Sequence, residues 1–576
     1  MDIKNKIENL IKEVLKNLDI EIQDIVLEHP VDLKMGDYST NVAMVVAKKN
    51  KINPKELAEN IAGEIKSALT REDLGGFLDK IETKNGFINF YLSQEFFINS
   101  IKEILENKNF GQNNLFAGKK IMIDYTQPNP FKPFHIGHLM SNAIGESISR
   151  IVEFSGAKAI RANYQGDVGP HVAKAIYGLL KFGMPDEDKS IPEKARYIGE
   201  LYAKGHDAYE DSPEAKKEIE EINQKIYDRS DEKINEIYDW GRRVTLEAFE
   251  EIYKILGTSF NYYFFESLVA PIGEKIVNEN LGKIFEKSDG AIVFKGEKYD
   301  PKLHTRVFIN SNGLPTYEGK ELGLTKTKFE KEKLDISIVI TAHEQAEYMK
   351  VVCRAIELID PEYASKMKHI THGMMRLASG KMSSRKGNVI TGESLLLESC
   401  EQILEKIKDR DFSDEEKKQI SEKVGVAALK YSILKQNIGG DIIYDAEKSI
   451  SFEGDSGPYL QYSYARANSV LEKAKKESIL PGFISLKSGL LEISEVEKLL
   501  YRFPEIVYRS AEEFEPHYIA NYLIDISRAY NTFYGNTKII DKDDPTSSYK
   551  VALTLAFSVI IKNGLYLLGI KAPERM

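Results

Sequence analysis

Cysteine is scarce in this sequence of 576 residues, which contains two cysteines and no Cys-x-x-Cys pair. Cys353 and Cys400 lie far apart in the chain, and neither has a histidine nearby at a spacing typical of metal ligands. Disulfide frameworks and structural zinc sites need more cysteines, or cysteines closer together. The sequence therefore argues against both, and it fits a protein of a reducing compartment.

Long hydrophobic runs and targeting segments are also lacking. The longest apolar stretch, residues 551–570, is interrupted by Lys562 and Asn563, and its uncharged part is too short to span a bilayer. The first residues mix acidic and basic side chains and place apolar ones at helical spacing, unlike a signal or transit peptide. We expect a soluble, cytoplasmic protein with no membrane partner.

An excess of positive charge is missing as well, because 79 Lys and Arg residues face 89 Asp and Glu residues, for a formal net charge of -10. This balance argues against a protein that coats nucleic acid through bulk basicity. It leaves room for contact with one phosphate backbone through local basic patches. The length and the 42% hydrophobic content indicate a globular protein of about three or four domains.

Helix and strand patterns divide the chain into three parts. Residues 1–112 carry two amphipathic helical patterns and a strand-like run at 86–92, and they close on a polar segment typical of a linker. Residues 113–395 alternate strand and helix patterns, and residues 396–576 are dominated by helical periodicity. We therefore predict an N-terminal α+β domain, a central α/β domain and an all-helical C-terminal bundle.

The central part begins with a strand at 120–125, a proline-rich loop, a helix that ends near Gly156 and a second strand at 158–164. A crossover of this kind joins parallel strands. Residues 172–256 are helical and strongly charged, which indicates an insertion. We expect the parallel sheet to continue after the insertion through the strand patterns at 290–294, 305–309, 335–340 and 368–372.

The loop after the first strand ends in Phe-His-Ile-Gly-His, which places His135, Gly137 and His138 where a helix begins. The unpaired backbone N–H groups and the positive end of the helix dipole favour a phosphate there, and the imidazoles add donors. Gly137 allows a nucleotide to approach the backbone closely. Taken alone, this short sequence is weak evidence, and ordinary loop histidines are the better interpretation of it.

A second glycine-rich loop, Ser-Gly-Lys-Met-Ser-Ser-Arg-Lys-Gly at 379–387, follows a late strand pattern. Its cations, Lys381 and Arg385 among them, would neutralise the charge that develops on a leaving pyrophosphate. Taken alone, the segment also fits a solvated basic turn. Taken alone, neither loop decides for the nucleotide interpretation.

Together the two loops resemble the paired HIGH and KMSKS signatures of the class I aminoacyl-tRNA synthetases. Within that class, the chain resembles the arginyl-tRNA synthetases over nearly its whole length. The resemblance implies a Rossmann-like catalytic domain with a helical insertion, an N-terminal domain for the D-loop of tRNA, and a helical domain for the stem and the anticodon. The matching stretches are GDYSTNVAM, PNPFKPFHIGH, NYQGDVGPH, LPTYEGKELGL, GKMSSRKG and LLGIKAPERM.

The resemblance assigns the ATP site position by position. In the family's KMSKS sequence the second lysine is replaced here by Ser384, and the lysine before the HIGH sequence is thought to compensate in relatives with the same loss. The catalytic residues implied are His135, His138, Lys132, Lys381 and Arg385. The ATP-binding residues implied are Gly137, Asp167, Gly169, His372, Gly373 and Met374. An aspartate like Asp167 is also common as a helix N-cap or a turn residue.

The family's arginine pocket maps onto Asn129, Glu266, Tyr317, Glu321 and Gln345. A guanidinium is planar, permanently charged and rich in donors, so a selective site needs carboxylates placed for forked hydrogen bonds. Glu266 and Glu321 supply them, although each acid taken singly also fits a solvated surface position. The family usually has Asp where this chain has Glu321, so the carboxylate extends one methylene farther and a bidentate contact is in question.

Two regions match tRNA-binding positions of the family. Phe87 and Asn89 match residues that stack on and hydrogen-bond to a D-loop base. Tyr459, Tyr462 and Arg466 match the anticodon-binding domain. Aromatic residues in alternating strands or at helical spacing are also typical of a core, and this alternative stays open for both regions.

The reaction implied is arginine activation with ATP to arginyl-adenylate and pyrophosphate, followed by transfer to the terminal adenosine of tRNA(Arg). The partners expected are L-arginine, ATP with bound Mg2+, and tRNA(Arg), for a monomer without zinc. Alternatives are another class I synthetase, a nucleotidyltransferase with the HIGH fold, and a nonenzymatic tRNA-binding relative. The helical residues after the basic loop weigh against the second, and the intact His135, His138 and Lys381 weigh against the third.

Overall fold

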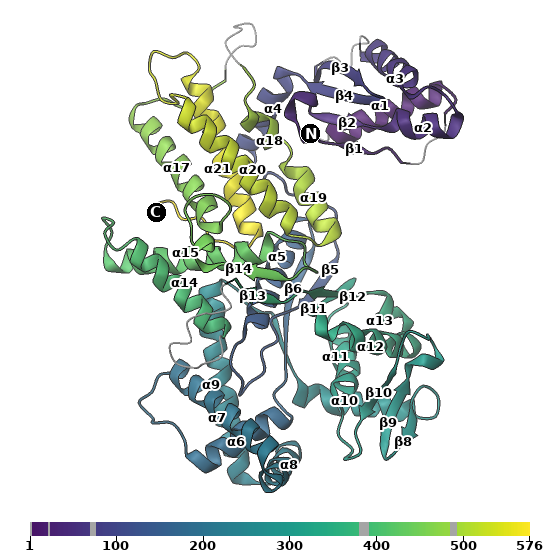
Figure 1. Cartoon of the computed structure of the whole chain (residues 1–576), viewed down its shortest axis with the longest axis vertical. Coiled ribbons are helices and arrows are strands. Elements are labelled where there is room, and N and C mark those ends of the chain that lie inside the picture. Colours follow the sequence, from purple (N-terminus) through teal and green to yellow (C-terminus); the bar gives the residue numbers. More distant parts are fainter. Residues whose placement is uncertain (1–2, 21–23, 70–75, 379–390, 484–491) are drawn as a thin grey trace.

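The structure is a computed structural model that describes residues 3–20, 24–69, 76–378, 391–483 and 492–576. The molecule is elongated, with the N-terminal part beside a helical bundle at one end and two lobes at the other (Figure 1). A parallel sheet lies between the bundle and the two lobes. The loops at the carboxyl ends of its strands therefore open toward the space between the lobes.

The N-terminal part is a four-stranded antiparallel sheet, in the order β1-β2-β4-β3, packed against helices. Helix α1 forms because Ile3, Ile7, Ile11 and Val14 recur on one face, and this face is buried. The elements are α1 (Ile3–Asn17), β1 (Leu27–Glu28), β2 (Tyr38–Thr40), α2 (Val42–Asn50), α3 (Pro54–Leu69), β3 (Leu78–Lys84), β4 (Phe87–Leu92) and the connecting helix α4 (Gln94–Glu106).

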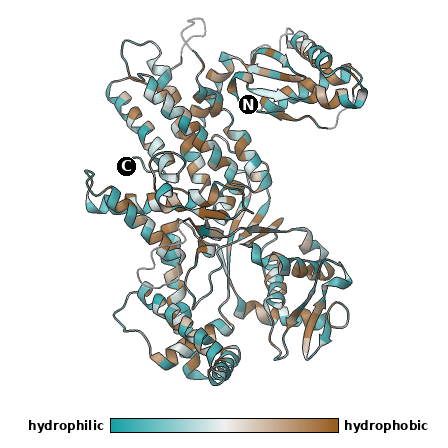
Figure 2. Ribbon diagram, in the orientation of Figure 1, coloured by the Kyte–Doolittle hydropathy of each residue, from teal (hydrophilic) through white to brown (hydrophobic). Residues whose placement is uncertain are grey.

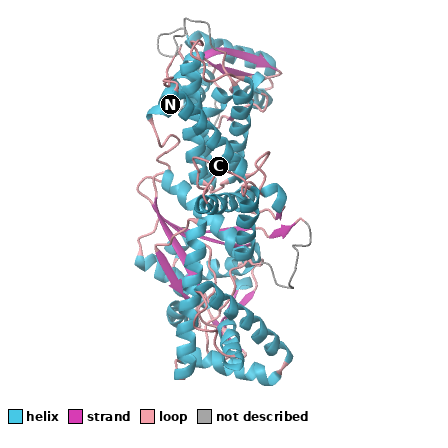
Figure 3. Ribbon diagram, turned by 90° about the vertical axis from the view of Figure 1, so that its left-hand side faces the viewer, coloured by secondary structure: helices cyan, strands magenta, loops and turns pink. Residues whose placement is uncertain are grey.

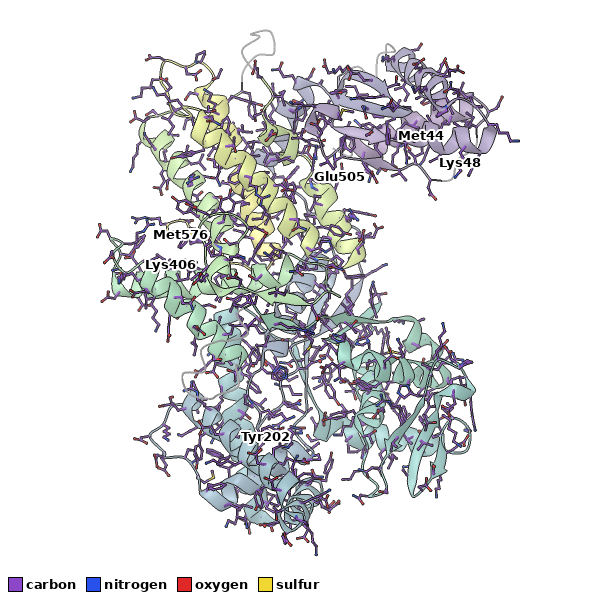
Figure 4. All side chains as sticks on the ribbon, in the orientation of Figure 1. Met44, Lys48, Tyr202, Lys406, Glu505 and Met576 are labelled. Carbon is purple, nitrogen blue, oxygen red and sulfur yellow. The ribbon has the colours of Figure 1, made fainter. Side chains whose placement is uncertain are left out.

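This part contacts the bundle through a polar cluster. Glu505 of α19 accepts a hydrogen bond from the Tyr38 hydroxyl, and its other oxygen lies 3.3 Å from Nε2 of His29. Figure 4 labels Glu505 on the bundle side of this contact. Tyr501 packs into the core of the N-terminal part, which ties the two regions together.

The central sheet has five parallel strands in the order β12-β11-β5-β6-β7. The chain builds β5, β6 and β7 toward one edge and later adds β11 and β12 on the other side of β5. Ligands in open parallel sheets bind at such a reversal of strand order, outside the carboxyl ends of the strands. The strands are β5 (Lys120–Asp124), β6 (Lys158–Gln165), β7 (Tyr262–Phe265), β11 (Ile336–Ala342) and β12 (Met367–His372).

The prediction that every later strand extends this sheet is wrong for two of them. Strands β9 (Ala291–Lys295) and β10 (Thr305–Ile309) pair with β8 (Glu286–Ser288) in a separate antiparallel sheet. Their aromatic residues pack with α12 in a core of their own. An alternating pattern indicates a strand but not its partner, and the four-residue strand β7 was too short to stand out from the sequence.

Two lobes flank the carboxyl edge of the sheet. One is the helical insertion, which has a separate apolar core. Its helices are α6 (Pro170–Phe182), α7 (Ile191–Asp211), α8 (Pro213–Asp228) and α9 (Glu232–Leu256). The other lobe contains the small antiparallel sheet with α10 (Glu266–Glu279), α11 (Tyr317–Lys331), α12 (Ala346–Ile359) and α13 (Pro361–Ser365).

The C-terminal part is helical, as expected, and it also contains the three-residue strand β14 (Ile442–Tyr444), which pairs with β13 (Met375–Leu377). Figure 3 shows its helices stacked above the sheet. The elements are α14 (Gly392–Lys406), α15 (Asp414–Leu434), α16 (Ala446–Ser449), α17 (Gly457–Lys476), α18 (Glu495–Leu500), α19 (Phe503–Glu513), α20 (His517–Asn536) and α21 (Ser547–Leu567).

Helix α21 is long and apolar enough to cross a membrane by length and composition, but 67% of its most apolar window is buried among the bundle helices. Figure 2 shows the hydrophobic residues of this helix in brown. The bundle core continues without interruption into the sheet, because Ile144 and Ile148 of α5 (Ile136–Phe154) share one cluster with Leu523 and Phe557. The helix that follows β5 is therefore held between the sheet and the bundle.

Candidate active site

The HIGH turn lies at the switch point of the sheet, where α5 begins directly after His135. The rings of His135 and His138 stack with centroids 3.4 Å apart. The backbone N–H of His135 donates to Nδ1 of His138 over 3.2 Å, so a neutral His138 carries its proton on Nε2. Burial, followed by the charge of His135, lowers the pKa of His138 well below its ordinary value. His138 is therefore a neutral hydrogen-bond donor at pH 7.

Gly137 keeps this turn compact. A Cβ at this position would lie 3.0 Å from the imidazole of His135, so a side chain would press on the stacked ring. In the first turn of α5, the N–H of His138 donates to the carbonyl of His135 over 3.0 Å. The N–H groups of Ile136 and Gly137 precede it at the positive end of the helix dipole. The turn therefore has the features of a phosphate site.

The segment from Thr391 onward, which follows the basic loop in the sequence, contacts the HIGH turn. Lys381 and Arg385, together with Ser384, lie outside the described residues. The first described residue after them, Thr391, forms a β-bridge with His135, and the N–H of Gly392 donates to the carbonyl of Phe134 over 2.8 Å. The start of α14 therefore lies beside the HIGH turn.

The segment after β12 lies on the other side of the HIGH turn. His372 is buried, its Nδ1 lies 2.7 Å from the carbonyl oxygen of Gly373, and its charge would act on the pKa of His135. A Cβ on Gly373 would lie 2.3 Å from the carbonyl oxygen of Gly440, so only glycine fits there. The side chain of Met374 is 37% exposed. His372, Gly373 and Met374 thus lie together at the end of β12, near the HIGH turn.

Asp167 has a more buried place than the sequence suggested. Its carboxylate is fully buried and accepts hydrogen bonds from Tyr238, Arg242 and both the N–H and the hydroxyl of Ser267. These bonds join β6 to α9 and α10. Gly169, two residues later, begins α6 with φ +125°, a conformation that favours glycine. Asp167 therefore shapes the pocket through its neighbours.

Asn129 and Glu266 both lie against the backbone of Gly166. The N–H of Gly166 donates to Oδ1 of Asn129 over 3.0 Å, and a Cβ on Gly166 would lie 2.9 Å from Oε1 of Glu266. Glu266 is the first residue of α10 and is buried. The loop after β5, the end of β6 and the start of α10 thus bring these two predicted residues together at the carboxyl edge of the sheet.

Helix α11 supplies two more residues of the predicted pocket, Tyr317 and Glu321, from one face. Four residues lie on the same side of this helix, because successive members are three, one and seven residues apart: Tyr317, Lys320, Glu321 and Lys328. Lys320 Nζ lies 2.5 Å from Oε2 of Glu266, and both side chains are buried. Lys320 was not singled out from the sequence, although this helical spacing was available as a signal.

Glu321 lies deeper. Burial raises its pKa to about 7, and the charge of Lys328 offsets part of that rise. Lys328 itself pairs with Asp124 at the end of β5, again with both side chains buried. The hydroxyl of Tyr164 is buried nearby and has no hydrogen-bond partner among the described residues. Asp124, Tyr164 and Lys328 were all missed by the motif comparison.

A cavity of about 410 Å³ opens between the HIGH loop, the insertion and α11. Lys132 lines it, with its ammonium 5.2 Å from the centre of the Tyr202 ring, which Figure 4 labels on the insertion. Lys132 also acts on the pKa of His135 and His138, so it lies close to both. Gln345, by contrast, is exposed and ends the short turn after β11. Other lining residues are Lys174, His206, Tyr227, Tyr317 and Lys320.

The two regions predicted to bind tRNA lie far from the HIGH turn. Phe87 is 41% exposed at the start of β4, whereas Asn89 is buried and accepts a hydrogen bond from the hydroxyl of Ser39 over 2.7 Å. Asn89 also lines a surface cavity of about 700 Å³. Three lysines line the same cavity: Lys34, Lys66 and Lys84. Phe87 is therefore not a core residue.

In the bundle, Tyr462 and Arg466 line a cavity of about 620 Å³ near the C-terminus. The guanidinium of Arg466 lies over the Tyr462 ring and donates to Asn531, which in turn donates to the Tyr459 hydroxyl. Figure 4 labels Met576 at this end of the bundle. Further cations line the cavity: Arg410, Lys473, Lys538 and Arg575. The protein of net negative charge thus has a local basic surface here.

Three family models match successive parts of the chain. The model described as "tRNA synthetases class I (R), catalytic domain" matches residues 100–446. The "Arginyl tRNA synthetase N terminal domain" matches residues 3–92, and the "DALR anticodon binding domain" matches residues 460–576. The matches follow the order of the three parts seen in the fold.

Individual proteins are similar over the full length. The chain is 31% identical over 589 residues to an arginine–tRNA ligase of Clostridium perfringens, with all of both chains covered. It is 29% identical to the arginine–tRNA ligase of Halothermothrix orenii, again over all of both. The solved Thermus thermophilus arginyl-tRNA synthetase superposes with a TM-score of 0.79 at 22% identity, covering 99% of this chain and 100% of that one.

Proposed function

The chain belongs to the arginyl-tRNA synthetase family of class I aminoacyl-tRNA synthetases, and we propose that its central cleft activates L-arginine with Mg-ATP and then charges tRNA(Arg) in the cytoplasm. In the first step the arginine carboxylate attacks the α-phosphorus, and the bond to the departing pyrophosphate breaks. In the second, a ribose hydroxyl of the terminal adenosine attacks the carbonyl carbon of the adenylate, and AMP leaves.

One observation supports this proposal most directly. The helix turn with the features of a phosphate site and the buried acidic residues lie at the same switch point of the sheet. His138 offers a neutral donor at the turn, and the carboxylates of Glu266 and Glu321 are buried on α10 and α11, behind the cavity residue Lys320 that pairs with Glu266. A phosphate site beside a carboxylate pocket suits a substrate pair of one nucleotide and one cationic amino acid. The protein then contributes mainly positioning and charge stabilisation.

Within this proposal, residues of the cleft divide between the two substrates. His135, Gly137 and His138 contact the phosphates, and His372, Gly373 and Met374 lie beside the adenine. Asn129, Tyr317 and Glu321 contact arginine, with Glu266 setting the charge of the pocket and Gln345 at its rim. Lys132 supplies the cation that the basic loop lacks at Ser384, which its position beside both histidines supports.

The proposal places tRNA across all three parts of the chain. The cavity at Asn89, with Phe87 exposed beside it, takes the D-loop, and the basic cavity at Tyr462 and Arg466 takes the anticodon. Aromatic rings beside cations are the usual platform for unstacked bases and phosphates. Tyr459 acts indirectly, since its hydroxyl accepts the hydrogen bond that orients Asn531 toward Arg466.

The experiment that tests the function is amino-acid-dependent exchange of labelled pyrophosphate into ATP, run separately with all twenty amino acids and with and without total tRNA. Arginine alone among them should support exchange and charging. Exchange with another amino acid would assign the chain a different substrate. An absence of exchange with every amino acid in both conditions would mean that the fold has lost the chemistry.

A further inference from the structure

The buried cluster around α11, next to the cavity that Tyr317 and Lys320 line, holds more charge than a single substrate cation needs. Three carboxylates, those of Asp124, Glu266 and Glu321, are buried there together. Two lysines of α11, Lys320 and Lys328, are buried with them. Uncompensated buried charge is costly, so the pairing of these five groups decides what the pocket can accept.

Lys320 and Glu266 form a closed pair. Their ammonium and carboxylate lie 2.5 Å apart, and the two side chains are 6% and 4% exposed. The ammonium also lies within 6 Å of the ring centres of Tyr317 and Tyr227, at 5.4 and 5.9 Å. Although burial alone would lower it, the carboxylate of Glu266 raises the pKa of Lys320. Lys320 is thus a cation held at the edge of the pocket by one carboxylate and two aromatic rings.

Lys328 and Asp124 form the second pair, deeper in the sheet, with both side chains almost fully buried. Asp124 also accepts from the N–H of Tyr164 and from the Gln127 amide. This pair therefore belongs to the frame that joins α11 to β5 and β6. Because Asp124 is paired with Lys328, its carboxylate is not available to a substrate either.

Glu321 is the carboxylate that remains. Within the described parts of the chain, it makes no hydrogen bond and no ion pair, although it lies near Glu266, Asp124 and Lys328. Asp124 and Glu266 are each matched by a lysine of the same helix. Glu318, a further buried acid that acts on Glu321, lies 3.4 Å from Arg306. Glu321 is therefore the acid of this group without a charged partner, and one guanidinium could supply that partner.

We propose that Lys320 is a specificity-determining residue, the internal counter-cation of Glu266, which leaves Glu321 as the one carboxylate open to the substrate guanidinium. This rests on the proposed arginine pocket and divides the roles of its two glutamates. Glu266 acts on arginine through Lys320, and Glu321 contacts it directly. A neutral amino acid would leave Glu321 buried without a partner, and a free Glu266 would demand a second cation.

The test compares single and paired substitutions in the full-length chain, with the dissociation constant of labelled arginine measured by equilibrium dialysis. Glu266→Gln alone leaves the ammonium of Lys320 without its partner beside the incoming cation, so binding should weaken about tenfold or more. Adding Lys320→Met removes that ammonium, so the double variant should regain most of the loss. Glu321→Gln should weaken binding at least as strongly as Glu266→Gln, and Lys320→Met should not rescue it.

A double variant that binds arginine no better than Glu266→Gln would overturn the proposal, because Glu266 would then contact the substrate itself. Rescue of Glu321→Gln by Lys320→Met would overturn it as well. If Lys320→Met does not fold, Lys320→Gln in the Glu266→Gln background replaces the ion pair by two amides and carries the same prediction. A wild-type chain that binds no arginine would instead refute the proposed function.

Comparing the KM for arginine with the KM for ATP distinguishes this role from a purely structural one. In exchange assays the Glu266→Gln change should raise the KM for arginine and leave the KM for ATP within about twofold. Lys320→Arg keeps the cation and should retain most of the affinity for arginine. Equal losses for both substrates, with Lys320→Arg as impaired as Lys320→Met, would show a structural role alone.

Discussion

At His138, one hydrogen bond fixes which ring nitrogen can serve a substrate. Its Nδ1 accepts from the backbone N–H of His135, which leaves Nε2 as the donor of a neutral ring. We expect His138→Ala, and likewise His135→Ala, to lower kcat for adenylate formation by about 10- to 1000-fold, the scale of losing one oriented donor. The measurement is arginine-dependent pyrophosphate exchange in the presence of tRNA.

His135→Asn serves as the matched variant, because asparagine is a favourable residue at the first position before a helix. It should keep the midpoint of thermal unfolding near that of the wild type while kcat falls. Near-normal charging by the His135 and His138 variants would show that the turn does not bind ATP.

Glu321 makes arginine binding dependent on pH. Burial raises its pKa to about 7 in the free enzyme, and a guanidinium binds the ionised form. A group with a raised pKa is protonated below that value, so affinity should be full above pH 7 and should fall as the pH drops below it. Between pH 7 and pH 6 the KM for arginine should rise by several fold, up to about tenfold for each unit below the pKa.

The KM for ATP, measured over the same pH range, is the internal control. Glu321→Asp, which restores the acid usual in the family, tests the same contact by shortening the side chain by one methylene group. A KM for arginine that is flat from pH 6 to pH 8, together with unchanged kinetics in Glu321→Asp, would mean that this carboxylate does not touch the substrate.

Among the elements, α10 and α11 cross so closely that glycine is required at the contact. A Cβ on Gly323 would lie 2.1 Å from the carbonyl oxygen of Val269, and a Cβ on Gly273 would lie 2.0 Å from that of Gly319. Gly323→Ala would push α11 and its charged face away from Glu266. We expect a loss of about 1 to 3 kcal/mol in the free energy of unfolding, and a raised KM for arginine.

Gly63→Ala in α3 is the control for this change, because a Cβ there would have no atom within 4 Å. In an exposed helix interior it should leave stability unchanged or raise it slightly. Chemical denaturation of both variants measures the difference. If Gly323→Ala were as stable as the wild type with normal arginine kinetics, the close crossing would not position the pocket.

Sequence motifs predicted the parts of this site that are local in the chain. The HIGH turn, the βαβ unit and the helical insertion follow from patterns within a few tens of residues. The pairing of Lys320 with Glu266 and of Lys328 with Asp124 joins residues 54 and 204 positions apart, and no local pattern fixes such contacts. For the same reason the sequence indicated β9 and β10 as strands but not the separate sheet to which they belong.

Across the whole molecule, the helix that begins at the HIGH turn is bonded to the end of the bundle. The hydroxyl of Ser147 donates to the carbonyl of Leu567 over 2.8 Å, and Arg150 donates to that of Tyr566 over 3.1 Å. The buried ammonium of Lys430 donates to the carbonyls of Leu256 and Gly569, joining the insertion to the same end of the chain. The C-terminal end of the bundle is therefore hydrogen-bonded to α5 and, through Lys430, to the end of α9.

The resemblance to the arginyl-tRNA synthetases and the altered basic loop lead to the prediction that activation of arginine itself requires tRNA, and these contacts offer a route for the effect. With Ser384 in place of a lysine, the basic loop has one cation fewer for the departing pyrophosphate, so other groups must complete the site. A tRNA that contacts the N-terminal part, the cleft and the bundle can use remote binding energy to bring the loop and Lys132 into the productive arrangement. Arginine and ATP alone should then give almost no pyrophosphate exchange.

Cognate tRNA should switch the exchange on, and tRNA with oxidised terminal hydroxyls should do so too, because it acts here as an effector and need not accept the amino acid. Weakening the basic surface of the bundle gives a second test, since Arg466→Ala should raise the tRNA concentration needed for half-maximal exchange while the rate at saturation stays near normal. Brisk exchange by enzyme freed of all RNA would refute the dependence and leave the assignment as a synthetase intact.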